Sequence, residues 1–208
     1  MSIVVHHLEN SRSQRVLWLL EELDIPYQVE RYQREPSSGL APDSLRRIHP
    51  LGKSPVIQDG EVTIAETGAI VDYLVNQAGG KLGQPAEAVG AMRYTHFMHY
   101  AEGSLMPPLY ALLVLARMGE SGRSMATSQR TMFATHLTWL DNELSDRPWF
   151  AGPDFTAADV MMSFPLEAAR QRGGLDASYE RLTEYLRRAH GRPAYQRGLD
   201  RGGPYAFA

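Results

Sequence analysis

One stretch, residues 49–74, constrains the fold more than any other part of the chain. Two short runs rich in β-branched residues, 55–57 and 62–64, flank an Asp59-Gly60 turn. That pattern is a strong signal for a β-hairpin. The apolar residues then change to helical spacing, so a helix is predicted to begin near Glu66. A strand pair that leads directly into a helix is therefore the most specific local pattern in the sequence.

Pro55 is the unusual residue of this stretch. Proline lacks the N–H that a sheet ladder needs, so a strand that starts on it is predicted at an edge or after a special turn. Only about 5–6% of X-Pro bonds in folded proteins are cis, so composition alone predicts a trans Ser54-Pro55 bond. A cis bond would instead leave the N–H and C=O of Ser54 facing out of the sheet, where an extended peptide can pair with them.

Composition excludes several classes of protein. No apolar run approaches the roughly 18 residues of a membrane span. The N-terminus lacks the basic start and apolar region of a signal peptide, so we expect a soluble cytoplasmic protein without a membrane partner. The net charge of −3 gives no general attraction for nucleic acid.

The chain contains no cysteine, so it has no thiol nucleophile or thiolate metal ligand. Any sulfur chemistry must therefore use the sulfur of a ligand. His96 and His99 share a helix face but have no third ligand nearby in sequence, so no metal site is expected.

The first part of the chain alternates strands and helices. Asn10 and Ser11 stand just before a run of strong helix formers, where an N-cap is expected, and capping alone is one explanation of both residues. The order of elements predicts a thioredoxin-like domain over residues 1–78, with its first and third helices on one face of the sheet. Besides the hairpin, the predicted elements are strands at 3–8 and 27–32 and helices at 16–23, 42–48 and 66–74.

A glycine-rich segment, 77–85, is the predicted domain boundary. Beyond it strand signals disappear, and residues 86–208 are predicted to form an all-helical domain. One long helical pattern over 86–118 is interrupted at Pro107-Pro108, where a kink is expected, and a second covers 124–144.

Residues 152–160 contain a capping box, in which Thr156 is the N-cap and Asp159 reaches back to it. On its own this motif shows only that a helix begins here. We assign Thr156 and Asp159 to stability, not to chemistry.

Two motifs in the first domain resemble the glutathione-binding half of cytosolic glutathione transferases, of the bacterial and fungal kind with a serine or asparagine at the N-terminal active site. They are the run from Gly52 to Val56 and the run from Glu66 to Ile70. The Thr-x-x-Asp box matches a folding element of the same family. The resemblance covers almost the whole chain and is specific because the motifs occur in this order and spacing.

The resemblance implies roles for individual residues. In that family the proline, here Pro55, is cis, and the backbone of the residue before it, Ser54, pairs with the cysteinyl part of glutathione. Glu66 and Thr67 hold the γ-glutamyl end: Glu66 pairs with its ammonium group, and Thr67 with the helix N-terminus binds its carboxylate. Lys53 precedes Ser54 and is a candidate partner for the glycyl carboxylate, although a lone lysine is more often solvated. Without the resemblance, Glu66 is equally explained by the helix dipole.

The catalytic residue of such an enzyme stabilises the glutathione thiolate, and Ser11 or Asn10 is in the right region. An ungapped alignment back from Leu20 places Asn10 at the catalytic position, whereas a one-residue gap places Ser11 there. We favour Ser11, because its hydroxyl matches the role in the serine-type classes, and keep Asn10 as the alternative. No tyrosine occurs among residues 1–26, and no cysteine is available.

The helical domain is expected to bind the second substrate, a hydrophobic electrophilic small molecule. Its candidate wall consists of Met and aromatic residues, which at helical spacing are more often part of a core. The family adds a homodimer in which Glu102 reaches the partner's site. The expected function is glutathione transfer in detoxification. The alternatives are glutathione-dependent peroxide or disulfide reduction at the same site, or a binding module without turnover. The candidates for the wall are Tyr100, Met106, Tyr110, Tyr205 and Phe207.

Overall fold

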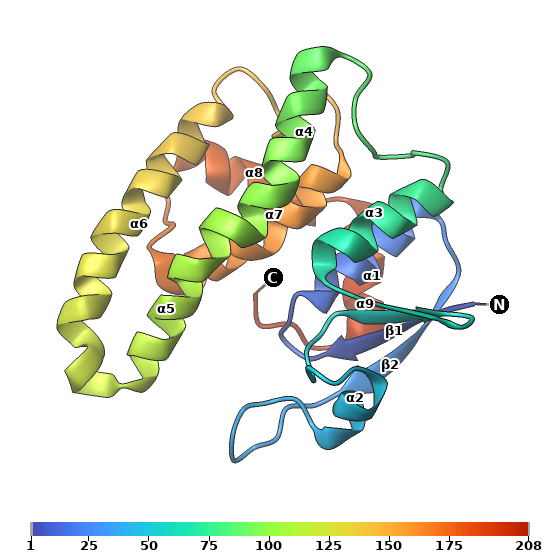
Figure 1. Ribbon diagram of the computed structural model, residues 1–208. Helices are drawn as coiled ribbons and strands as arrows, with labels where there is room; N and C mark the ends of the chain where they lie inside the picture. Colours follow the sequence, from blue (N-terminus) through green and yellow to red (C-terminus); the bar gives the residue numbers. More distant parts are fainter. Residues whose placement is uncertain (1, 208) are drawn as a thin grey trace. The chain divides into compact units, whose positions relative to one another are not determined.

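The computed structural model describes residues 2–207, and contacts within the chain divide it into two units. The first unit consists of residues 2–83 together with the C-terminal segment 190–206. The second consists of residues 84–189 and Phe207. Their elements are labelled in Figure 1.

A four-stranded sheet forms the centre of the first unit. Within the described residues its strands are β1 (Ile3–Leu8), β2 (Tyr27–Tyr32), β3 (Val56–Asp59) and β4 (Val62–Ala65), in the order β2-β1-β3-β4. β1 pairs in parallel with β2 and antiparallel with β3, so that Val5 lies opposite both Val29 and Ile57. The predicted strands and the hairpin between β3 and β4 are confirmed.

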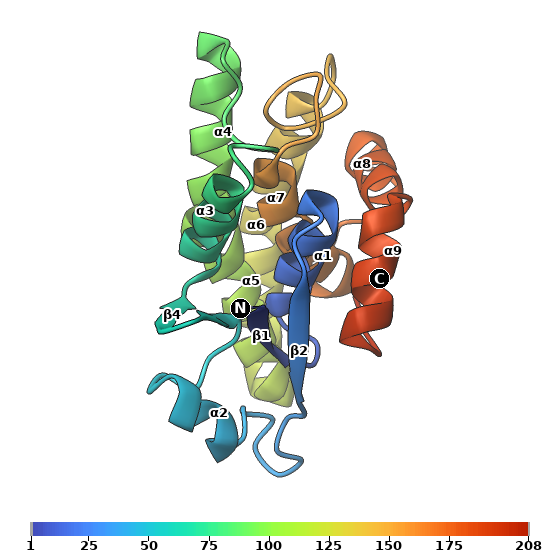
Figure 2. The same ribbon diagram turned by 90° about the vertical axis from the view of Figure 1, so that its right-hand side faces the viewer.

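The helices of this unit are α1 (Ser13–Leu23), α2 (Asp43–Ile48), α3 (Thr67–Gln77) and α9 (Pro193–Gly202). α1 contacts β1, α3 and α9, and Figures 1 and 2 show α1 and α3 together against the sheet. The predicted placement of the first and third helices on one face is therefore confirmed. The apolar residues of α1 from Val16 to Leu20 are almost completely buried, so this helix is the core of the unit.

The C-terminal segment packs on α1, whereas the sequence grouped it with the helical domain. Arg192 donates to Glu22 at 2.8 Å, and the Tyr195 ring meets the Trp18 ring edge-on at a centroid distance of 5.2 Å. A Cβ on Gly198 would lie 3.1 Å from the Trp18 backbone, so glycine allows the close approach of the two helices. These contacts join residues that are far apart in the sequence. Helical periodicity describes only neighbouring residues, so it could not predict them.

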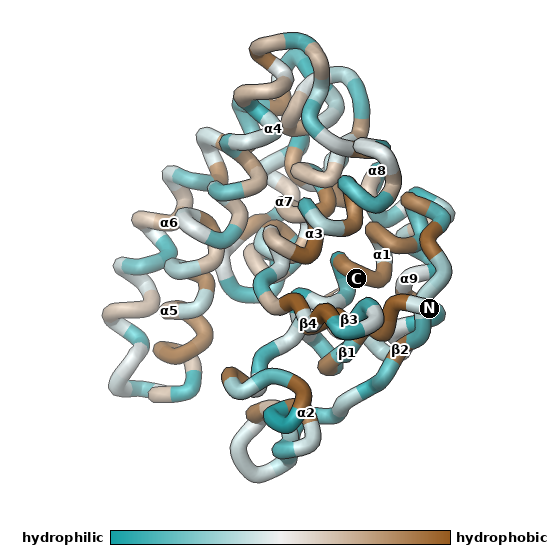
Figure 3. The backbone as a smooth tube through the Cα atoms, turned by 45° about the vertical axis from the view of Figure 1, so that its right-hand side comes forward, coloured by the Kyte–Doolittle hydropathy of each residue, from teal (hydrophilic) through white to brown (hydrophobic). Residues whose placement is uncertain are grey.

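The second unit is helical in its described residues, apart from an isolated bridge between Trp149 and Gly152. The predicted break in the first long helix is confirmed as a π-helical turn, after which Pro107 and Pro108 lie in the first turn of the next helix. In α6, hydrophilic and hydrophobic segments alternate along the helix (Figure 3), but Met132, one of its apolar residues, is exposed. The elements are α4 (Ala88–Tyr100), η1 (Ala101–Leu105), α5 (Met106–Arg117), η2 (Gly119–Gly122), α6 (Arg123–Glu143), α7 (Ala157–Ala168), η3 (Ala169–Gly173) and α8 (Glu180–His190).

The capping box at the start of α7 is confirmed. Asp159 Oδ2 accepts from the Thr156 N–H at 2.9 Å and from its hydroxyl at 3.1 Å, while Oδ1 accepts from the Phe150 N–H at 2.9 Å. Burial raises the pKa of Asp159 to about 6, although these hydrogen bonds act in the opposite direction. The carboxylate joins two segments of the second unit, as a folding element does.

None of the helices in the described residues combines the length and apolar character that crossing a bilayer requires.

Candidate active site

The Ser54-Pro55 peptide bond is cis. The trans expectation from composition is therefore wrong, and the expectation from the family resemblance is confirmed. Pro55 comes just before β3, an interior strand, so the run that it opens is not at a sheet edge. The Ser54 hydroxyl donates to the His6 C=O at 2.9 Å and accepts from the Leu8 N–H at 3.2 Å. Within residues 2–207 the N–H and C=O of Ser54 form no hydrogen bond.

The start of α1 lies beside Ser54. The helix begins at Ser13 with Arg12 in the N-cap position, so neither predicted cap residue is the cap. Ser11 precedes that cap position, and its Oγ accepts from the N–H of Ser13, the first residue of the helix, at 3.2 Å. The Ser11 and Ser54 Oγ atoms lie 3.5 Å apart. The structure thus brings the favoured catalytic candidate next to the predicted peptide-binding residue.

Asn10 has a fixed side-chain orientation. Its backbone has a φ of 50°, a left-handed conformation that asparagine adopts more readily than most residues. Its Oδ1 accepts from the Ala206 N–H at 2.7 Å. The NH₂ group therefore points the other way, and it has no partner in the part of the chain that the structure describes.

Two further polar residues lie behind Ser11. The Ser13 Oγ is 2.7 Å from the Ser11 Oγ and 2.8 Å from the His7 Nδ1. Burial and the positive charge of Arg31 lower the pKa of His7 to about 4, against the opposing effects of a Gly202 backbone hydrogen bond and Glu9. His7 is thus neutral at pH 7.

Sequence reasoning placed His7 only in a strand and gave Ser13 no role. Their contact depends on how the strand end meets the helix start, so no sequence pattern signals it.

The start of α3 is the other polar part of the site. Glu66 immediately precedes the helix, is exposed, and has a φ of 70°. Thr67 is the first residue of the helix and is buried; its Oγ1 accepts from the guanidinium of Arg15 at 3.4 Å. The first N–H groups of a helix lack partners within it, so positive charge and free donors gather around Thr67. Arg15 was not assigned to the site from the sequence. The signal that could have found it is a charged residue directly before the apolar run of α1.

Lys53 lies in the first unit, whereas Tyr100, Glu102, Met106 and Tyr110 lie in the second. Lys53 is exposed and has no partner among residues 2–207. Glu102 lies in η1 of the second unit. Within that unit the Tyr100 hydroxyl is 2.5 Å from the His136 Nδ1, Met106 is buried in the core, and Tyr110 is 59% exposed.

No cluster of three or more potential metal ligands occurs within the described residues.

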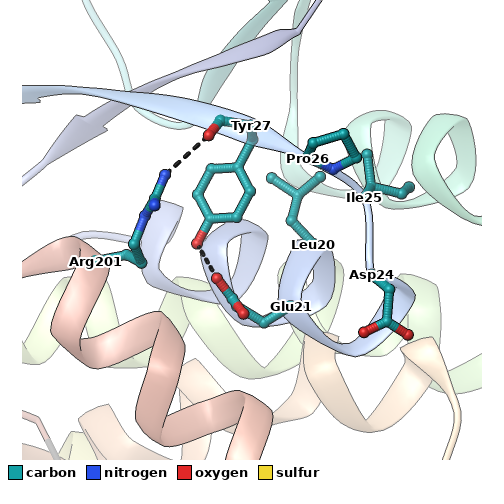
Figure 4. A pocket seen from close by; sticks show the side chains of 7 residues that line it. All are labelled: Leu20, Glu21, Asp24, Ile25, Pro26, Tyr27 and Arg201. Carbon is teal, nitrogen blue, oxygen red and sulfur yellow. Dashed lines mark hydrogen bonds between the residues drawn. The ribbon is translucent and has the colours of Figure 1, made fainter.

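A pocket of about 380 Å³ lies elsewhere on the first unit, at the end of α1 and the start of β2 (Figure 4). Its polar side chains have partners within the unit, and Asp24 accepts from Lys81 at 2.9 Å. Arg201 donates to the Tyr27 C=O at 2.8 Å, and the Tyr27 hydroxyl donates to Glu21 at 2.8 Å. None of the candidate site residues lines it, so we assign it no role in the activity.

The first unit is thioredoxin-like and carries a Ser-cis-Pro loop beside a hydroxyl-bearing helix start, and a helical unit follows it along the chain. Two family models match the chain: the N-terminal domain of glutathione S-transferase over residues 2–76, and its C-terminal domain over residues 90–188. Glutathione S-transferase 3 of Schizosaccharomyces pombe is 35% identical, over 92% of this chain and 84% of that protein.

Solved structures agree with these matches. A glutathione S-transferase from Actinobacillus pleuropneumoniae superposes with a TM-score of 0.87 at 29% identity, covering 99% of this chain and 95% of the other. A glutathione transferase homologue from Sulfitobacter, with bound glutathione, gives a TM-score of 0.81 at 21% identity, over 97% of this chain and 98% of that one. This chain therefore belongs to the glutathione S-transferase family of enzymes. The predicted family, fold class and enzymatic character are confirmed.

Proposed function

We propose that this glutathione transferase binds glutathione along the loop at Ser54 and stabilises its thiolate at the start of α1, for attack on a hydrophobic electrophile. The observation that carries the proposal is the 3.5 Å separation of the Ser11 and Ser54 Oγ atoms, next to a Ser54 backbone whose N–H and C=O have no hydrogen-bond partner among residues 2–207. A cysteinyl residue paired with that backbone has its side chain near Ser11.

The energetics are adequate without a metal or a general base. A free thiol has a pKa of about 8.5, and lowering it by two units requires about 2.7 kcal/mol. A hydrogen bond to a charged acceptor contributes about 1.5–3 kcal/mol, and a helix N-terminus about 0.3–2 kcal/mol. One donor at the start of α1 therefore suffices to hold glutathione largely as thiolate at neutral pH.

The ends of the tripeptide have matching groups. Thr67, the N-terminus of α3 and the Arg15 guanidinium bind the γ-glutamyl carboxylate, while Glu66 binds the ammonium group. Lys53 binds the glycyl carboxylate from its exposed position, and Pro55 shapes the loop. In the Sulfitobacter homologue the ligand is also glutathione, which supports this choice of co-substrate.

The remaining parts of the proposal come from the family. Residues 1–78 form the glutathione-binding domain and residues 86–208 contribute the side chains that bind the second substrate. The protein acts in the cytoplasm as a homodimer, in detoxification, and Glu102 reaches the partner's site. The same thiolate serves glutathione-dependent peroxide or disulfide reduction, which is the second candidate activity.

Two alanine variants test the catalytic assignment. We expect Ser11→Ala, at pH 7 and saturating glutathione, to lower kcat/KM for an aryl halide by about 25-fold, because the thiolate fraction falls from about 76% to about 3% when the thiol pKa returns from about 6.5 to about 8.5. By the same linkage it should weaken glutathione binding by about fourfold. Asn10→Ala should change kcat/KM by less than about threefold. Ser163→Ala is the matched control, because it removes a buried hydroxyl, bonded to the Val160 C=O, from the second unit.

The reverse order of effects would assign catalysis to Asn10, whose NH₂ group is the other available donor. Full activity of both variants would reject the start of α1 as the active site. Glutathione binding by the wild-type protein without turnover of any electrophile, peroxide or disulfide would instead identify a binding module.

A further inference from the structure

The hydrogen-bond chain behind Ser11 runs inward through Ser13 to His7. The Oγ–Oγ distance is 2.7 Å and the Oγ–Nδ1 distance is 2.8 Å, and all three side chains are buried. Each hydroxyl has a single proton to donate, so the chain has a direction. The direction determines whether Ser11 offers a proton or a lone pair to a ligand.

Two acceptors determine where the Ser13 proton goes. One is the Leu8 C=O, 3.4 Å from the Ser13 Oγ. The other is the His7 ring, which is neutral at pH 7 because burial and Arg31, opposed by Glu9, leave its pKa at about 4. Nδ1 lies 2.8 Å from the Ser13 Oγ, and we place the single proton of the neutral ring on the other nitrogen, which leaves Nδ1 free to accept from Ser13. Nδ1 is then an acceptor, and Ser13 donates away from Ser11.

It follows that Ser11 is the donor in the 2.7 Å contact. Its Oγ also accepts from the Ser13 N–H at 3.2 Å, so the Ser11 hydroxyl both donates to and accepts from Ser13. The alternative acceptor, the Ser54 Oγ, is 3.5 Å away and therefore a weaker partner. The Ser11 proton accordingly points into the protein.

We infer that Ser13 and His7 are positioning residues that hold the Ser11 hydroxyl proton inside the protein and so oppose ionisation of a thiol bound at Ser11. The inference rests on the proposed function, in which the glutathione sulfur lies beside Ser11. Toward a neutral thiol, the Ser11 Oγ accepts the S–H proton. To donate to a thiolate, Ser11 must turn its proton away from Ser13.

This arrangement has a chemical use. A thiolate becomes less nucleophilic as the pKa of its thiol falls, and the most effective attacking thiol has a pKa near the working pH. By competing for the Ser11 proton, Ser13 prevents the thiol pKa from falling further than the reaction needs. Ser13 thereby sets the ratio of thiolate to thiol at the site.

The test is the pKa of glutathione bound to the protein, measured from the ultraviolet absorbance of the thiolate as a function of pH. Ser13→Ala removes the competitor and should lower that pKa by up to about one unit, a tenfold change in the ratio of thiolate to thiol. Ser13→Thr keeps the hydroxyl and should match the wild type. Ser11→Ala should raise the pKa, and adding Ser13→Ala to it should have no further effect.

The outcomes separate the two proposals. An unchanged or raised thiol pKa in Ser13→Ala, with a raised pKa in Ser11→Ala, overturns this inference and leaves the proposed function intact. No effect of Ser11→Ala on the thiol pKa overturns both, because the sulfur then does not contact Ser11.

A second measurement uses the wild-type protein and does not depend on the stability of a variant. Nitrogen NMR of labelled imidazoles should show His7 with an unprotonated Nδ1, both without and with glutathione. The spectrum of His7→Gln identifies its signal among the seven histidines. A proton on Nδ1 in the glutathione complex overturns the inference.

Discussion

The side-chain oxygens of Ser11 and Ser54 lie 3.5 Å apart although 43 residues separate them in the sequence. Ser11 follows the end of β1, and Ser54 precedes β3. The antiparallel pairing of these strands, in which His6 lies opposite Val56, brings the two loops to the same end of the sheet. The register of the central strands therefore builds the proposed active site, and a change in that register would separate Ser11 from Ser54.

The Ser54 hydroxyl should contribute to stability as well as to binding. Ser54→Ala removes both of its hydrogen bonds and leaves the Leu8 N–H and the His6 C=O without that partner. We expect the free energy of unfolding in urea to fall by about 1–3 kcal/mol and glutathione to bind more weakly. Ser54→Thr retains the hydroxyl and is the control. Unchanged stability of Ser54→Ala would show that these hydrogen bonds do not hold the loop.

Glu66 should affect binding and stability in opposite directions. Its φ of 70° favours glycine, and backbone conformations of this kind cost other residues about 1–3 kcal/mol. Glu66→Gly should therefore fold at least as stably as the wild type while binding glutathione at least tenfold more weakly, as titration calorimetry and thermal melting can measure.

Glu66→Gln keeps the backbone strain and loses only the charge. It should weaken binding without any gain in melting temperature. Wild-type affinity in both variants would mean that Glu66 does not contact the ligand ammonium group.

Asp159→Ala should damage the fold and spare the chemistry. It leaves the N–H groups of Phe150 and Thr156 without their acceptor inside the second unit. We expect a loss of about 2–4 kcal/mol in unfolding free energy and a lower yield, with kcat of the folded fraction within about twofold of the wild type. A large fall in kcat at unchanged melting temperature would contradict the structural role.

His7 makes the protein less stable in acid. Its pKa falls from 6.5 in the unfolded chain to about 4 in the folded protein, so the unfolded chain binds more protons between these values. The stabilisation is complete above pH 6.5 and is lost as the pH falls toward 4, by about 3 kcal/mol in total. Denaturant unfolding of His7→Gln should accordingly show a smaller loss between pH 7 and pH 4.5 than the wild type.

Asp159 acts in the opposite direction, because its raised pKa gives a contribution that is present at low pH and is lost as the pH rises through about 6. Asp159 is present in both the wild type and His7→Gln, so the difference between their pH dependences of stability reports on His7 alone. Equal pH dependence of the two proteins would reject a buried neutral His7.

Local patterns predicted much of the fold and part of the site. The hairpin of β3 and β4, the start of α3 and the capping box at Thr156 are each encoded within about ten residues, and all are present. The cis Ser54-Pro55 bond was different: composition favoured trans, and only the family resemblance implied cis.

Contacts between separate helices and strands were not predictable in this way. Three such contacts depend on how helices and strands pack after they have formed. They are the contact of Ser13 with His7, the hydrogen bond from Arg15 to Thr67, and the packing of α9 on α1. Periodicity within a segment describes which face is buried but not what covers it.

The most direct measurement is a crystal structure of the protein with glutathione. The account predicts that the cysteinyl N–H and C=O pair with the backbone of Ser54 and that the sulfur lies within hydrogen-bond distance of the Ser11 Oγ. A structure in which glutathione leaves the Ser54 backbone unpaired and places its sulfur away from the start of α1 would contradict it.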